Sequence, residues 1–149
     1  MLPAAMPDEA AMPARGAYRP AAPVAVRWTL PATADLPQAV DACVAGAYTA
    51  WGAAGHQADL LADLAADFIT DVLGAAASPC VTVTAMLQGR RATLSVAPAT
   101  APAPPAVVAL PRREAPTTMP SSWGHVPLAH GLCVYATVNL IVHHRRGPR

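Results

Sequence analysis

Alternation of apolar and polar residues marks three short strands in the chain. Residues 24–30 alternate bulky apolar side chains with smaller or polar ones, as a half-buried strand does, and Pro31 ends the run. The same period covers residues 80–87 and resumes over residues 92–96, after a turn at residues 88–90. The two later runs predict a β-hairpin.

A first helix is predicted directly after the first strand. Asp35 stands at the position of its cap, and Pro37 falls in its first turn, where helices tolerate proline. Apolar residues then recur at helical spacing until Gly52 and Gly55 stop the pattern. The expected buried face consists of Val40, Val44, Ala47, Tyr48 and Trp51.

The clearest helical pattern covers about residues 57–76. Its expected buried side consists of Leu60, Leu61, Leu64, Phe68, Val72 and Leu73, and a ladder of aspartates at i, i+4 spacing consists of Asp59, Asp63, Asp67 and Asp71. Like charges at this spacing repel by about 0.2–0.5 kcal/mol per pair. The ladder therefore indicates either a cation or basic partner, or a solvated helix face. We prefer the solvated face for Asp59 and Asp63.

Prolines divide the chain into folded and unfolded parts. Of the seventeen prolines, five lie in residues 1–23 and eight in residues 98–127. We expect residues 1–23 to be disordered and residues 98–127 to form a long loop, because proline removes backbone donors. The folded domain is expected over residues 24–142, before a basic tail at residues 143–149.

The end of the domain carries a weaker pattern. Gly131, Leu132, Tyr135 and Val138 suggest a short helix that begins near His130. A strand over residues 140–142 is expected to follow it.

Charge and cysteine content exclude several classes of protein. The formal net charge is +1 and all ten basic residues are scattered arginines, a pattern that does not favour nucleic-acid binding. The three cysteines are widely spaced in apolar stretches, as in reduced proteins. The start of the chain contains acidic residues and no basic ones, unlike a signal peptide, and the uncharged runs are too interrupted for a spanning helix. We expect a cytoplasmic protein without a nucleic-acid or membrane partner.

The order of strand, helix, acidic helix, hairpin, loop and glycine-led helix resembles the small histidine-kinase-like ATPases of actinobacteria that act as anti-sigma factors and serine kinases. The segment Trp28-Thr-Leu-Pro-Ala32, with Val40, Val44 and Trp51-Gly52, looks like their first strand and helix. The resemblance implies an α+β fold: a two-layer sandwich with a mixed, mostly antiparallel sheet covered on one face by about three helices. It also implies that this chain is truncated at the C-terminus, without the last strand of the sheet.

The second helix aligns with the motif in which the family presents a glutamate and an asparagine to ATP and magnesium. Asp67 stands for the glutamate, Asp71 for the asparagine and Ala75 for a usual histidine. The resemblance implies a catalytic role for Asp67, and cofactor and Mg²⁺ binding for Asp71.

Two other parts of the family's nucleotide site are altered. Pro98 stands near the place of the aspartate that reads adenine, and the glycine-rich phosphate lid is reduced to the segment around Gly131 and Leu132, which would be its cofactor-binding residues. We therefore expect no cofactor, or Mg-ATP if the site is competent.

Outside these motifs, two features are candidates for binding. Trp123 lies between serine and glycine in the proline-rich stretch, where it could anchor a protein partner or dock on the domain. His125, His130 and Cys133 are close in sequence, but their spacing matches no standard zinc pattern.

Three functions are consistent with these features. The leading hypothesis is a regulatory protein that acts in transcriptional signalling by binding a sigma factor or an anti-anti-sigma-like protein, on a kinase-like ATPase scaffold with weak or lost ATP binding. The first alternative is an active ATP-dependent serine kinase and anti-sigma factor, with Asp71 on magnesium and Asp67 beside the attacking hydroxyl. The second is a structural module that forms a homodimer.

Overall fold

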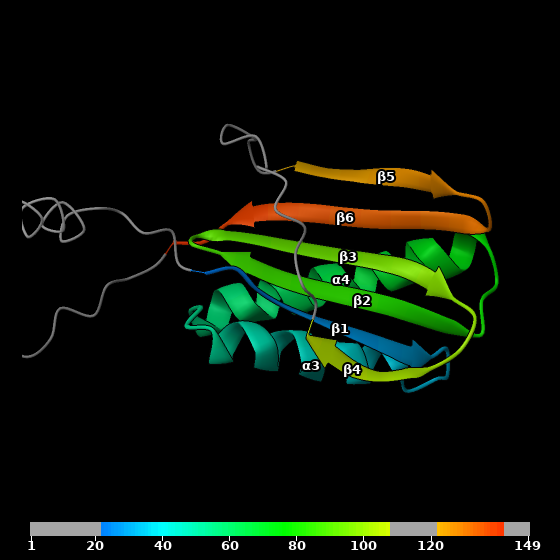
Figure 1. Ribbon diagram of the computed structural model, residues 1–149, viewed down its shortest axis with the longest axis horizontal. Helices are drawn as coiled ribbons and strands as arrows, with labels where there is room; N and C mark the ends of the chain where they lie inside the picture. The colour runs from blue at the N-terminus through cyan, green and yellow to red at the C-terminus, as the bar shows by residue number, and fades with distance from the viewer. Residues whose placement is uncertain (1–21, 108–121, 142–149) are drawn as a thin grey trace, which may run out of the picture.

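Six strands form one antiparallel sheet in the computed structural model, which describes residues 22–107 and 122–141 (Figure 1). The strands lie in the order β4-β1-β2-β3-β6-β5, and every pairing between them is antiparallel. In chain order the elements are β1 (Val24–Pro31), α3 (Leu36–Ala50), α4 (Gly55–Ala75), β2 (Cys80–Gln88), β3 (Arg91–Ala99), β4 (Ala103–Val107), β5 (Ser122–Leu128) and β6 (Gly131–Asn139).

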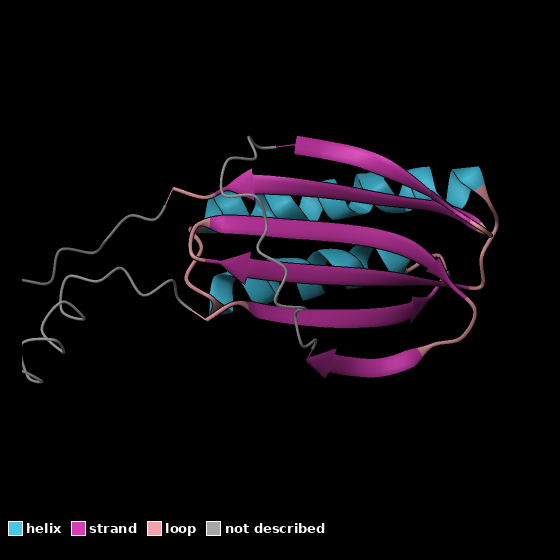
Figure 2. Ribbon diagram, turned by 45° about the horizontal axis from the view of Figure 1, so that its top comes forward, coloured by secondary structure: helices cyan, strands magenta, loops and turns pink. Residues whose placement is uncertain are grey.

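Both described helices cover the same face of the sheet, and no helix among the described residues covers the other face (Figure 2). The register explains which side chains meet them: Trp28 is opposite Val83, and Leu30 is opposite Val81, so these apolar residues point to the helices together. The completely buried large side chains are Tyr48, Leu36, Leu61, Leu94, Val40, Val44, Val72, Val81, Val83, Val96 and Val134. Each contributes about 1.5–3 kcal/mol by its burial.

α3 begins after Asp35, as predicted, with Pro37 in its first turn. Asp35 occupies the cap position, although its carboxylate makes no capping hydrogen bond. The apolar face is buried as expected at Val40, Val44 and Tyr48. Close to the helix end, the rings of Tyr48 and Trp51 meet edge to face at 5.3 Å.

α4 confirms the second predicted helix, but the prediction that Leu60 belongs to its buried side is wrong. Leu60 is 51% exposed, whereas Leu61 is completely buried. Ala58, Ala62 and Ala65 are buried, so the buried stripe of α4 is centred on their side of the helix and Leu60 lies outside it.

The β2–β3 hairpin has the predicted position and register. Gln88 pairs with Arg91, so Gly89 and Arg90 form a two-residue turn. Gly89 has a φ of 60°, which suits the first central position of a type II′ turn.

The prediction of a long loop over residues 98–127 is wrong at both of its ends. β3 continues through Pro98 to Ala99, and β4 and β5 are strands that contain prolines. Both β4 and β5 lie at edges of the described sheet, where a missing N–H interrupts no ladder. Pro98 is tolerated in the central strand β3 because the pairing of β3 with β6 ends at Val96. Beyond Val96, one side of β3 has no partner strand among the described residues, so a missing N–H on that side interrupts no ladder.

The predicted helix from His130 is also wrong, because Gly131–Asn139 forms strand β6. Its apolar residues Val134 and Ala136 face the core, and Cys133 and Tyr135 face the other side of the sheet. Leu140 and Ile141 follow β6 outside any strand. Hydrogen bonds fix both residues to the domain. Leu140 N donates to Arg90 O at 2.7 Å, and the side-chain amide of Gln57 donates to O of Ile141 and accepts from N of Ile141.

The predicted α+β class is therefore confirmed, as a sheet with helices on one face. The sheet is wholly antiparallel rather than mixed, and two helices rather than about three occur in the described ranges. Neither of them is long and apolar enough to cross a membrane. The predictions for residues 1–21 and for the tail at residues 143–149 lie outside the described residues, as does Val142.

Candidate functional site

A pocket of about 350 Å³ lies between α4 and the last hairpin of the sheet. We call it the α4–β5 pocket; it is lined by Leu64, Asp67, Phe68, Asp71, Trp123, Ala136, Thr137 and Val138. It brings together three of the site residues that the sequence predicts: Asp67, Asp71 and Trp123. Leu64 and Phe68 give the pocket an apolar side.

The pocket exists because β5 extends the sheet beyond the helix. α4 packs on β3 and β6, and β5 adds one more strand outside β6 (Figure 1). Trp123 is directly opposite Ala136, which is buried under α4, so the indole points to the helix side of the sheet. No described helix covers it there, and Trp123 remains 71% exposed.

His125 follows Trp123 on the same side of β5. The two rings lie 5.6 Å apart at an angle of 58°. Since His125 is opposite the buried Val134, it also projects to the helix side. The two rings form an aromatic strip along the outer rim of the pocket.

Asp67 and Asp71 supply the charge of the pocket. They are one helical turn apart on α4 and both side chains are exposed. Asp59 and Asp63 continue the same ladder in the sequence and are exposed too, but they do not line the pocket. The carboxylates that the motif alignment selects are therefore the ones beside Trp123.

Gly131 and Leu132 lie elsewhere, at the beginning of β6. Gly131 has a φ of 154°, and a Cβ there would be 3.1 Å from Cγ of Pro98 and 3.7 Å from Cβ of Ala76. This glycine therefore serves a tight hairpin that packs on the end of β3. Neither residue belongs to the described lining of the α4–β5 pocket.

The described lining of the pocket fits only part of the magnesium nucleotide that the resemblance implies: Asp67 and Asp71 would hold Mg²⁺, but the described lining has no cation for the phosphates. A triphosphate needs cations or several converging backbone N–H groups. The charged side chains among the described lining residues are Asp67 and Asp71, both anionic. Without Mg²⁺ they repel the phosphates, and the described lining residues include no arginine or glycine to offset that repulsion.

The three possible zinc ligands do not assemble. His125 and Cys133 project to opposite faces of the sheet, because their partners Val134 and Val126 alternate along the hairpin. In the part of the chain that the structure describes, no group of three or more histidine, cysteine or acidic side chains can hold a metal ion. Burial raises the pKa of the Cys133 thiol, which makes it less reactive.

One part of the pocket was missed in the sequence analysis. The strip Ala136–Thr137–Val138 forms part of the pocket, yet it was assigned to a helix. The alternation of Leu132, Val134, Ala136 and Val138 with polar or small residues was the available signal for a strand.

Comparison of the chain with protein-family models, curated proteins and solved structures gave no match. The function must therefore be inferred from the chemistry of the site.

Proposed function

We propose that the protein is a regulatory interaction module in transcriptional signalling, on a scaffold that resembles the histidine-kinase-like ATPases of the anti-sigma-factor type. In this proposal it binds a protein partner, a sigma factor or an anti-anti-sigma-like protein, through the α4–β5 pocket. The observation that carries the proposal is Trp123: a large indole 71% exposed, in a pocket that also contains two carboxylates.

The pocket has the chemistry of a protein-docking site. A tryptophan that is exposed in the free protein and becomes buried against a partner often provides much of the binding energy. Leu64 and Phe68 offer apolar surface for one anchoring side chain of the partner. Asp67 and Asp71 offer carboxylates for an arginine or lysine beside that anchor. The partner segment should therefore combine an apolar residue with a basic one.

Weak or lost nucleotide binding is part of the proposal. The support is the anionic lining of the pocket, together with the position of Gly131 in a hairpin packed on Pro98. A kinase would need the phosphates of ATP to lie near Asp71, where the described residues supply no positive charge.

The test is a calorimetric titration with purified sigma factors and anti-anti-sigma proteins of the source organism. Trp123→Ala should weaken the binding by about thirtyfold, the effect of losing an interface hot spot. The double variant Asp67→Asn/Asp71→Asn should also weaken it. Asp59→Asn is the matched control, since Asp59 belongs to the same ladder but lies outside the pocket.

Two outcomes would overturn the proposal. One is unchanged partner affinity in both pocket variants. The other is self-association of the protein that Trp123→Ala abolishes, measured by sedimentation, because the pocket would then serve a homodimer.

A further inference from the structure

A second pocket lies on the opposite face of the sheet, the one without a helix. Its volume is about 540 Å³, and it is bounded by β1, β2, the end of β3, β4 and the connection from β3 to β4. The described residues that line it are Arg27, three threonines and otherwise alanines and prolines. We call it the Arg27 pocket.

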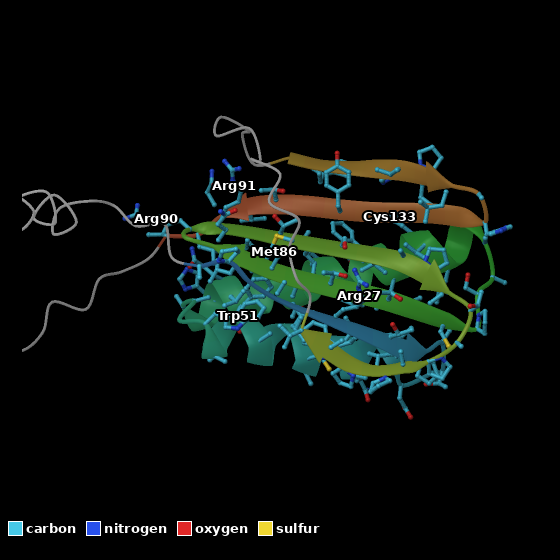
Figure 3. The ribbon with its side chains drawn as sticks, viewed as in Figure 1. Arg27, Trp51, Met86, Arg90, Arg91 and Cys133 are labelled. Carbon is cyan, nitrogen blue, oxygen red and sulfur yellow. The ribbon has the colours of Figure 1, made fainter. Side chains whose placement is uncertain are left out.

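Arg27 is the charged residue of this pocket. It is exposed on β1, opposite Thr84 on one side and Ala106 on the other. Figure 3 shows it on the uncovered face together with Met86 and Cys133. Within residues 22–107 and 122–141, the guanidinium has neither a hydrogen bond nor an ion pair, and no acidic residue lines the pocket.

Two hydroxyls stand beside the guanidinium. Oγ1 of Thr29 and Oγ1 of Thr82 are 3.0 Å apart in the pocket, and Thr29 is 9% exposed. One hydroxyl donates to the other, so the accepting hydroxyl keeps its own proton for a third group. Thr29 follows Arg27 by two residues, which places both side chains on one face about 7 Å apart. The pocket thus presents a fixed hydroxyl donor on the same face as a guanidinium that has no partner among the described residues.

We propose that the Arg27 pocket binds an organic monocarboxylate. One guanidinium balances one negative charge and can donate two parallel hydrogen bonds to a carboxylate. A phosphate near neutral pH carries more negative charge than this single cation offsets. The alanine and proline walls accept the apolar body of an organic acid, and the volume falls in the range of small-molecule sites, about 300–1,000 Å³.

This site is independent of the proposed protein-docking function. It lies on the other face of the sheet, and the two sets of lining residues share no member. A ligand here contacts the β3–β4 connection through Thr100 and Ala101. Binding should therefore fix this connection against β1 and β2.

The experiment is a titration of the full chain with benzoate, followed by two-dimensional amide NMR spectra of isotope-labelled protein. Saturable shifts are expected at Thr29, Thr82 and Ala101. Arg27→Gln should lower the affinity by about tenfold or more, the loss of a hydrogen bond to a charged group. Arg27→Lys should retain part of the affinity, because it keeps the charge without the planar fork.

Matched controls define the site and the ligand class. Arg90→Gln removes an exposed arginine at the β2–β3 turn, outside the pocket, and should leave benzoate binding unchanged. Benzamide has the shape of benzoate without its charge and should not bind. Thr82→Val should weaken binding without changing the fold, because Thr82 is only partly buried.

Three results would overturn the proposal. They are the absence of saturable shifts with benzoate, equal affinity in wild type and Arg27→Gln, and tighter binding of inorganic phosphate than of benzoate. The last result would assign the pocket to phosphate instead.

Discussion

At the residue scale, the hydroxyl of Tyr48 connects the helix layer to the sheet. The completely buried side chain donates to O of Thr93 at 2.9 Å or O of Met86 at 3.1 Å, and accepts from N of Met86 at 3.3 Å. Tyr48→Phe leaves these groups with one partner fewer and should lower the free energy of unfolding by about 1–3 kcal/mol. Urea unfolding measures the change.

Tyr135→Phe is the control for this substitution. Tyr135 is only half-buried, and its ring lies over Gly124, where a Cβ would be 2.7 Å from the phenol oxygen. Its hydroxyl satisfies no buried backbone group in the described structure, so its removal should have a small effect. Equal losses in the two variants would contradict the role assigned to Tyr48.

Tyr48 also gives the stability a dependence on alkaline pH. Burial raises the pKa of Tyr48 well above its ordinary value of 10.0. In the unfolded chain the phenol ionises near pH 10, whereas in the folded chain it keeps its proton. Above about pH 10 the folded state therefore binds more protons than the unfolded state. The contribution of Tyr48 to the free energy of unfolding is lost progressively as pH rises from there toward the folded pKa. This part of the alkaline destabilisation should be absent in Tyr48→Phe.

At the element scale, the orientation of α4 about its own axis determines which of its leucines are buried in the core. Leu61→Ala should cost about 2–5 kcal/mol, because the side chain is completely buried and leaves a cavity. Leu60→Ala, one position away, should cost less than about 1 kcal/mol, since Leu60 is 51% exposed. Thermal unfolding of the two variants compares them; similar losses would contradict the orientation.

Local patterns predicted the elements whose apolar pattern contains no proline. β1, α3, α4 and the β2–β3 hairpin follow from alternation, helical spacing and Gly89. β5 could not be assigned by a rule that treats proline as a loop signal, whereas β6 contains no proline and its alternation was taken for helical spacing. Pro127 is acceptable only because β5 is an edge strand, and its place at the edge depends on the assembled sheet.

The candidate site was predictable only in part for the same reason. Asp67 and Asp71 are one turn apart on a single helix, so the sequence alone places them together. Their proximity to Trp123 requires that the β5–β6 hairpin lies beside α4. This arrangement brings together residues far apart in the chain. Arg27 carried no local signal, because the pocket around it forms from four strands and a connection.

At the scale of the whole molecule, charge is divided between the two layers. The described aspartates lie in or directly before the helices, and the described arginines lie in the strands or the β2–β3 turn. Among the described residues, this separation leaves the ladder on α4 without an arginine in its own layer. The ladder therefore costs stability, a cost that proteins commonly accept at functional surfaces.

Neutralising the pocket carboxylates should accordingly stabilise the protein. Asp67→Asn/Asp71→Asn removes two like-charge pairs, Asp63 with Asp67 and Asp67 with Asp71, and should raise the unfolding midpoint by a few degrees at low ionic strength. Added salt should reduce the gain. Asp41→Asn is the control, since Asp41 has no acidic residue four positions away. A lower midpoint in the double variant than in this control would contradict the account.

The central claim is that the α4–β5 pocket serves a protein partner and not a nucleotide. Thermal unfolding with and without millimolar Mg-ATP or Mg-ADP tests it most directly, because a ligand that binds only the folded state raises the midpoint. The account predicts the same midpoint with and without nucleotide. A clear rise that Asp71→Ala abolishes would contradict it and would assign the site to a nucleotide-dependent kinase.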